Sequence, residues 1–195
     1  MTSVDVDVIQ AADRKRAVAT LALAFAADPL TRWTWPDTYQ YATYWPKFVE
    51  AFAGGAFDHG TAHGLEDCRA VALWLSPGHG PDEETLMAVA RESMDDQVFE
   101  DTIGLFEQMD AVHPRVDHWY LPVTGVDPVA QGQRLGSTLM AHALAICDSE
   151  GLPAYLEATN PRSRNLYARL GFDVIEVIQC GTSPPVWAML RPPRS

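Results

Sequence analysis

The chain has 195 residues, of which 47% are hydrophobic, and a formal net charge of −12 at neutral pH. This size and apolar content are enough for one buried core, so we expect a single domain over residues 1–195. A strongly acidic surface without a basic patch excludes nucleic acid and anionic membranes as expected partners. The longest apolar stretch is too short to span a bilayer, and the beginning of the chain does not resemble a secretory signal. Three widely spaced cysteines fit reduced thiols, and we therefore expect a cytoplasmic protein.

The first half of the chain has both strand and helix periodicities. Valines alternate with aspartates at residues 4–8, which predicts a half-buried strand. A helix is expected from a cap at Asp13 to Ala27, with its end at Asp28 before Pro29. An aromatic stripe at helical spacing predicts a core-facing helix over residues 38–58. The expected elements that follow are strands at 61–66 and 69–75, joined as a hairpin, and helices at 83–90 and 97–112.

In the second half, strands and helices alternate. The sequence pattern predicts a strand at 117–126, a helix at 135–149, a strand at 153–158, a short helix at 163–170 ended by Gly171, and strands at 172–178 and 186–190. We find no internal repeat, and no linker is long enough to separate domains.

A glycine-containing turn at residues 131–137 lies between an expected strand and an expected helix. The first backbone N–H groups of a helix have no intrahelical partner and lie at the positive end of its dipole, so they can bind a pyrophosphate. The turn lacks the three glycines of a dinucleotide fingerprint and the lysine of a P-loop. The sequence therefore indicates a nucleotide-like cofactor bound in another way.

Two motifs in a fixed order narrow this choice. Val126-Asp127-Pro128 precedes the 131–136 turn, and Asn160-x-x-Ser163-x-x-Leu166-Tyr167-x-x-x-Gly171-Phe172 follows it. This pairing resembles the GCN5-related N-acetyltransferase (GNAT) family. The stretches 72–75, 151–157 and 166–172 are most similar to its puromycin N-acetyltransferase branch.

The resemblance implies an α/β fold with a mixed, mostly antiparallel sheet. Helices would cover both faces, and the sheet would be splayed between its fourth and fifth strands so that acetyl-CoA enters the gap. The acetyl-CoA-binding core would span about residues 117–172. The turn would hold the pyrophosphate, while backbone groups of the fourth strand and Asn160 would hold the pantetheine arm. The residues implied at the cofactor are Val123, Thr124, Gly125, Val126, Gln131, Gly132, Gln133, Arg134, Leu135, Gly136, Ser137, Asn160, Ser163 and Tyr167.

One residue of the turn departs from the family pattern. Arg134 occupies a position where the family often has glycine. Either Arg134 takes a helical φ and its guanidinium adds a contact to phosphate, or its side chain obstructs the cofactor. We expect accommodation, because the flanking glycines Gly132 and Gly136 remain in place.

Direct acetyl transfer to an amine needs a base, an acid and an oxyanion donor. Tyr167 matches the family tyrosine that stands beside the sulfur, and a phenol is protonated at neutral pH as a general acid must be. The general base is either His118 or Glu157. A backbone N–H near Val123 or Thr124 is the expected oxyanion donor.

The acceptor is expected to be the primary amine of a small molecule. Trp33, Trp35, Tyr120 and Glu157 are the candidate acceptor-binding residues, and an aromatic-rich pocket would suit a drug-like or aminonucleoside amine. His59 and His63 are four residues apart, but they flank a glycine-containing turn and lack nearby Cys or acidic ligands at zinc-site spacing, so we expect no metal. A homodimer is compatible with the sequence. The alternatives are a catalytically silent acyl-CoA sensor on the same fold and an acetyltransferase for protein lysines or N-termini.

Overall fold

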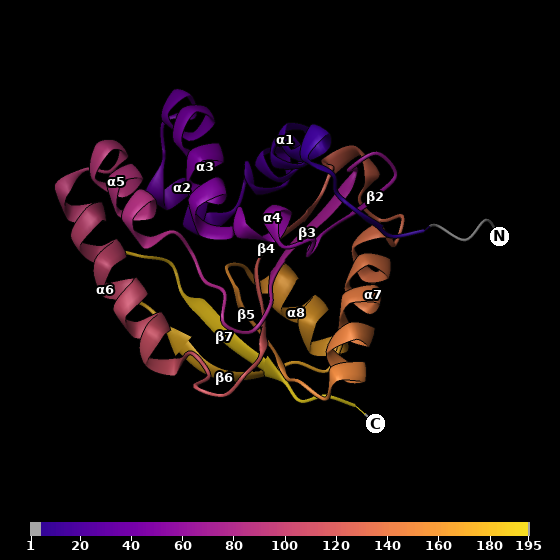
Figure 1. The fold of residues 1–195 in the computed structure, drawn as a ribbon. Coiled ribbons are helices and arrows are strands. Elements are labelled where there is room, and N and C mark those ends of the chain that lie inside the picture. The colour runs from indigo at the N-terminus through magenta and orange to yellow at the C-terminus, as the bar shows by residue number, and fades with distance from the viewer. Residues whose placement is uncertain (1–4, 195) are drawn as a thin grey trace.

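The computed structural model describes residues 5–194, and it folds into a seven-stranded open sheet flanked by helices (Figure 1). The strand order is β1-β2-β3-β4-β5-β7-β6. All neighbouring strands are antiparallel except the β4–β5 pair, which confirms the predicted mixed, mostly antiparallel sheet. The strands are β1 (Asp7–Val8), β2 (Ala62–Leu65), β3 (Ala70–Leu75), β4 (Trp119–Val126), β5 (Ala154–Ala158), β6 (Asp173–Ile178) and β7 (Val186–Arg191).

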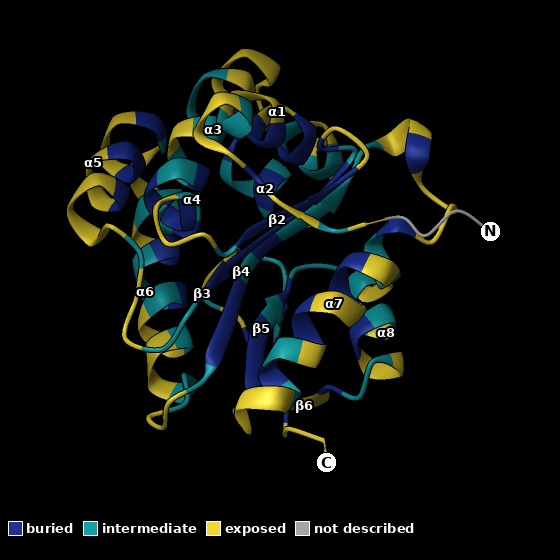
Figure 2. Ribbon diagram, turned by 45° about the vertical axis from the view of Figure 1, so that its right-hand side comes forward, coloured by how far each residue is buried: buried dark blue, intermediate teal, exposed yellow. Residues whose placement is uncertain are grey.

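The helices cover the two faces unequally (Figure 2). One face packs against the first six α-helices and the other against the last two. Side chains of β5 alternate between these layers, so Tyr155 belongs to the first core and its neighbour Leu156 to the second. The helices are α1 (Arg14–Phe25), α2 (Pro29–Thr34), α3 (Thr38–Ala53), α4 (Gly55–Asp58), α5 (Glu83–Ser93), α6 (Asp96–Val112), α7 (Leu135–Glu150) and α8 (Pro161–Arg169), with 3-10 turns η1 (Ala11–Asp13) and η2 (Pro128–Ala130).

The centre of the sheet opens between β4 and β5. These strands pair only from Trp119 and Ala154 to Leu121 and Leu156, although both continue beyond that point. The pairing ends immediately before Pro122, which has no N–H to donate to a neighbouring strand. The register between β3 and β4 also shifts here, as in a β-bulge. The predicted splay between the fourth and fifth strands is therefore present.

Several expected boundaries differ from the structure near the N-terminus. The predicted strand at 4–8 is reduced to Asp7–Val8, and Val4 lies outside the described residues. Asp13 belongs to a 3-10 turn, and its side chain makes no capping bond to α1. The predicted helix over 38–58 is divided into α3 and α4 at Gly54.

The sequence interpretation missed α2 altogether. Asp28 was expected to end a helix, but its carboxylate accepts hydrogen bonds from the N–H groups of Leu30 (3.1 Å) and Thr31 (3.2 Å) and so begins the next one. Pro29 is well suited to the first helical turn, where its missing N–H would have no partner. Asp28-Pro29 therefore marks both the end of one helix and the start of another.

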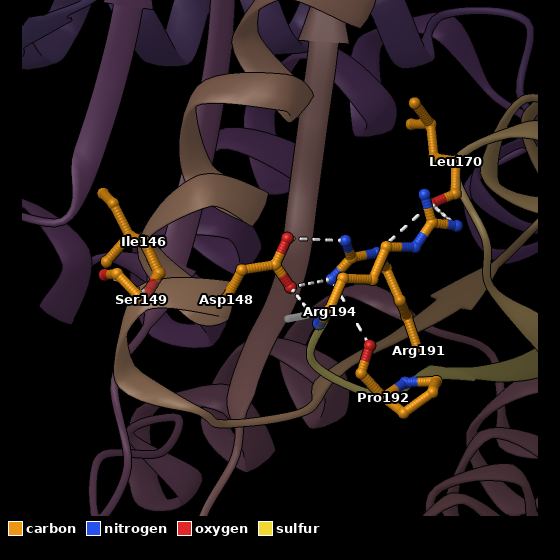
Figure 3. A network of polar contacts seen from close by, with 7 residues as sticks. All are labelled: Ile146, Asp148, Ser149, Leu170, Arg191, Pro192 and Arg194. Atoms are coloured by element: carbon orange, nitrogen blue, oxygen red, sulfur yellow. Dashed lines mark hydrogen bonds and ion pairs between the residues drawn. The ribbon is translucent and has the colours of Figure 1, made fainter.

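An ion pair between Arg191 and Asp148 connects the C-terminal strand β7 to α7 (Figure 3). Arg191 is 3% exposed, and its guanidinium contacts both carboxylate oxygens of Asp148 at 2.7 and 2.8 Å. The backbone N–H of Arg194 donates to the same carboxylate, and Arg191 Nε donates to the carbonyl oxygen of Leu170. These bonds hold α7, the end of α8 and the C-terminal segment together.

Candidate active site

An apolar cavity of about 100 Å³ lies beside the splayed strands, on the face covered by the first six helices. Its lining comes mainly from α2, α3 and α6 and from the ends of β4 and β5. The lining residues are Phe25, Leu30, Thr31, Trp33, Thr34, Trp35, Trp45, Phe48, Val49, Phe52, Met94, Thr102, Leu105, Phe106, Met109, Pro122, Val123, Glu157, Thr159 and Val186.

The two predicted acceptor tryptophans both line this cavity. Trp35 is 2% exposed, and its indole N–H donates to Ser93 Oγ at 3.0 Å. Trp33 is half-buried and donates to Thr182 Oγ1 at 3.1 Å, which links α2 to the loop between β6 and β7. The aromatic stripe of α3 serves two purposes, since Trp45 belongs to the core and also lines the cavity.

Glu157 is the one charged residue among the described residues that line the cavity. Its Oε1 atom is buried and has no hydrogen-bond partner within the described part of the chain. Burial raises the pKa of this carboxyl group to about 7, although the phenols of Tyr120 and Tyr155 partly oppose the rise. A carboxyl group with such a pKa can accept a proton near neutral pH, as a general base must.

Tyr120 and His118 are not among the residues that line the cavity. Burial and then the Glu157 charge raise the pKa of Tyr120 well above its ordinary value, so this phenol stays protonated. His118 Nδ1 lies 2.7 Å from the carbonyl oxygen of Val116, and its Nε2 lies 2.9 Å from His113 Nε2. Both ring nitrogens of His118 are therefore engaged outside the cavity, and of the two candidate bases only Glu157 faces it.

The glycine-containing turn leads directly into α7. No side chain caps this helix, and its first turn carries no acidic residue. Gly132 has φ +82°, and a Cβ placed on Gly136 would approach Val126 Cγ2 to 3.2 Å. The first N–H groups of α7 thus retain the capacity to bind an anion such as a pyrophosphate. Gln131, Gln133 and Ser137 belong to the same turn, in which Ser137 Oγ donates to the Arg134 carbonyl at 2.8 Å, while Leu135 is buried.

Arg134 does not have the helical φ that was expected of it. It takes φ +65° and ψ +6°, a left-handed conformation that favours glycine. This agrees with the glycine that the family often carries at that position. The Arg134 side chain itself is exposed.

Beyond Leu121, the edge of β4 that faces β5 has no partner strand. Thr124 and Val126 alternate onto this free edge, whereas Val123 is in register with Leu73 of β3 on the other side. The Val126 carbonyl oxygen accepts from Gln131 Nε2 at 3.3 Å, and the other backbone groups of this edge are available to an extended ligand. Two predicted cofactor residues also have structural roles here. Thr124 Oγ1 donates to the Val71 carbonyl, and a Cβ on Gly125 would come within 2.6 Å of Ala24 in α1. Gly125 therefore allows α1 to pack closely on β4.

Asn160 is the N-cap of α8, Ser163 lies in the first turn of this helix and Tyr167 in its last turn. Asn160 Oδ1 caps the helix by accepting from the Ser163 N–H at 2.9 Å, and its Nδ2 donates to Asp28 Oδ2 at 3.0 Å. Tyr167 is 7% exposed and packs in the core on the face opposite the cavity. Burial and then the nearby Asp28 charge raise its pKa above the ordinary value, so its phenol is protonated at neutral pH.

Sequence reasoning missed two polar residues of this region. Asp28 is 6% exposed and accepts hydrogen bonds from Thr159 Oγ1 at 2.6 Å as well as from Asn160, so it ties α2 to the segment between β5 and α8. The Asp-Pro start signal could have identified it. Thr102 is 5% exposed and lines the cavity, but an isolated threonine in a helix carries no sequence signal.

Within residues 5–194, no group of three or more His, Cys, Asp or Glu side chains is arranged to hold a metal ion. No helix in the same range combines the length and the apolar character needed to cross a membrane.

A seven-stranded mixed sheet that opens between its parallel strands β4 and β5 is the architecture of acyl-CoA N-acyltransferases. The model of the acetyltransferase (GNAT) family matches residues 27–172. The chain therefore belongs to the GNAT family and is an N-acetyltransferase. The co-substrate of this family is acetyl-CoA.

Individual relatives agree with this assignment. An N-acetyltransferase of Schizosaccharomyces pombe, described as uncharacterised, is 26% identical over 96% of this chain and 83% of its own length. A Corynebacterium glutamicum structure, described as histone acetyltransferase HPA2 and related acetyltransferase, has a TM-score of 0.69 and 26% identity, covering 100% of this chain and 98% of that one. Polyamine N-acetyltransferase of Drosophila melanogaster has a TM-score of 0.66 at 17% identity, covers 97% of this chain and 100% of its own, and shares the fold.

Proposed function

We propose that this protein transfers acetyl from acetyl-CoA to the primary amine of a small molecule, in a ternary complex and without an acyl-enzyme. The observation that carries this proposal is the position of Glu157, a half-buried residue whose buried carboxylate atom Oε1 lies at an aromatic cavity near the splayed end of β5. A carboxylate in an apolar site both attracts an ammonium ion and can remove its proton.

Three groups of this chain have roles in the reaction. Acetyl-CoA supplies a thioester whose carbonyl carbon bonds to the amine nitrogen as the C–S bond breaks. Glu157 takes the first proton from the ammonium ion, and Tyr167 holds the proton that the departing thiolate needs. A backbone N–H near Val123 or Thr124 stabilises the oxyanion. The nitrogen loses two protons in all, of which one is balanced by the thiol and the other leaves to solvent through Glu157.

Acetyl-CoA binding is assigned to the free edge of β4 and the N-terminal turn of α7. The absence of a cap on α7 and the glycines of the preceding turn favour a pyrophosphate there. Asn160 is engaged by Asp28 and Ser163, so in this proposal it positions the start of α8 and offers its backbone to the pantetheine arm.

A small acceptor fits a cavity of about 100 Å³ better than a protein chain does, and a small-molecule amine is also the acceptor named for the fold neighbour from Drosophila. The likeness to puromycin N-acetyltransferases remains a prediction, as does a homodimer. A catalytically silent sensor would have no need of a general base in the cavity.

The test is acetyl-CoA binding by calorimetry, followed by thiol release with a panel of primary amines that includes puromycin. Gly136→Trp is expected to abolish binding, since even a Cβ is tight against Val126. Gly80→Trp is the matched control, because Gly80 has open space around it and lies outside the turn. Binding without turnover on any amine would favour the sensor, and no binding to wild type would contradict the proposal.

A further inference from the structure

The charge distribution around the cavity limits what the acceptor can be. Nineteen of the twenty lining residues are uncharged, and the exception is Glu157. Nine of the lining side chains are aromatic or methionine: Phe25, Trp33, Trp35, Trp45, Phe48, Phe52, Phe106, Met94 and Met109. Such a site has one attachment point for a cation and an otherwise apolar wall.

The two buried aspartates of the surrounding elements are already engaged and are not free to bind a second cation. Asp28, before α2, accepts from two backbone N–H groups and from Thr159 and Asn160. Asp101 of α6 accepts from the N–H and hydroxyl of Thr182, both at 2.8 Å, and from Gln97. Neither side chain lines the cavity. A second ammonium or guanidinium group placed there would be buried without a counter-charge, which is costly.

Among the described residues that line the cavity, one buried hydroxyl lacks a partner. Thr102 Oγ1 is buried and forms no hydrogen bond within the described residues, although it lines the cavity. Helical hydroxyls commonly donate to the carbonyl four residues earlier, as Thr34 and Ser93 do here. An unpaired buried hydroxyl is unfavourable unless a ligand satisfies it. Thr102 thus offers one hydrogen bond to a polar substituent of the acceptor.

We propose, building on the proposed transferase function, that the acceptor is a monocationic primary amine whose body is a single aromatic ring with one polar substituent. Glu157 binds the ammonium group, the aromatic walls hold the ring, and Thr102 hydrogen-bonds the substituent. The cavity volume of about 100 Å³ is smaller than the roughly 150 Å³ of an apolar cavity that accommodates benzene, so it leaves room for no more than one ring. A polyamine or an aminoalkyl guanidine is disfavoured, because its distal charge has no partner.

The experiment compares kcat/KM for phenethylamine, tyramine and agmatine, measured as thiol release from acetyl-CoA. Phenethylamine and tyramine are expected to exceed agmatine by on the order of 100-fold, given the cost of an unpaired buried charge. Thr102→Val should lower kcat/KM for tyramine about 10-fold and leave phenethylamine unchanged. Thr20→Val is the control, because Thr20 is a buried helical threonine that does not line the cavity.

The outcomes distinguish a wrong acceptor assignment from a wrong transferase function. Equal or better use of agmatine would overturn the monocation assignment while leaving the transferase function intact. An equal effect of Thr102→Val on both aromatic amines would overturn the role of its hydroxyl. Acetyl-CoA binding without thiol release on these amines and also on a broader panel of amines would instead contradict the proposed function. Thiol release on the broader panel alone would overturn only the aromatic acceptor.

Discussion

At the scale of single residues, the two most informative side chains are Glu157 and Arg134, and they differ in what the sequence could reveal. The position of Glu157 at the end of a strand made it a candidate base, but its burial depends on α2 and α6, which pack over it from elsewhere in the chain. Its alternative, His118, belongs to the residue type that most often serves as a general base. The contact with His113 that engages His118 could not be read from spacing.

Arg134 supports a prediction that separates its backbone from its side chain. Arg134→Ala keeps the Cβ atom, so the energetic cost of the left-handed conformation at φ +65° should not change. The free energy of unfolding should therefore be unchanged as well. If the guanidinium contacts phosphate, acetyl-CoA affinity should fall about 5-fold, and the difference should shrink as salt is raised. Calorimetry at two salt concentrations measures both effects. Tighter binding by the variant would mean that the arginine obstructs the turn.

At the scale of elements, the long helices and central strands could be predicted because their apolar periodicity is strong. The motif pairing likewise predicted the splay. The bulge beside Pro122 and the existence of α2 could not be predicted in the same way. The bulge lies at Pro122 in β4, and α2 begins at Asp28-Pro29. The effect of these few residues depends on the segments that pack around them.

Asp28 is expected to matter for both stability and catalysis. Asp28→Ala removes the cap of α2 and leaves Thr159 and Asn160 without an acceptor, so it should lower the free energy of unfolding by about 2 to 3 kcal/mol. Because α2 carries Trp33, the KM for the amine should also rise. Asp37→Ala, which removes the exposed cap of α3, should cost about 1 kcal/mol and leave KM unchanged. Urea unfolding and steady-state kinetics on both variants provide the comparison; an unchanged KM in Asp28→Ala would refute the link.

At the scale of the whole molecule, the Asp148–Arg191 pair makes the free energy of unfolding depend on pH in the acid range (Figure 3). Hydrogen bonds from Arg191 lower the pKa of Asp148 to about 2. A carboxyl group with a lowered folded-state pKa contributes stability above its unfolded pKa of about 4, and this contribution is lost as pH falls through about 2.

Asp148→Asn should therefore reduce the free energy of unfolding by about 2 kcal/mol at pH 7. The difference from wild type should narrow between about pH 4 and pH 2. Asp110→Asn breaks an exposed pair with Arg115 and should have a much smaller effect. Urea unfolding across this pH range measures the difference, and a gap that persists unchanged at pH 2 would argue against the ion pair as its source.

In the proposed reaction Glu157 removes the proton from the acceptor amine, and the pH dependence of kcat/KM tests this role most directly. Wild type should gain activity with slope one up to a pKa near 7 and then reach a plateau. Glu157→Gln should be about 10² to 10⁴ times slower and should lack that inflection, with activity rising towards the pKa of the free amine at about 10. Glu176→Gln, at an exposed glutamate of β6, should keep the wild-type profile. An inflection near pH 7 that survives in Glu157→Gln would show that another group is the base.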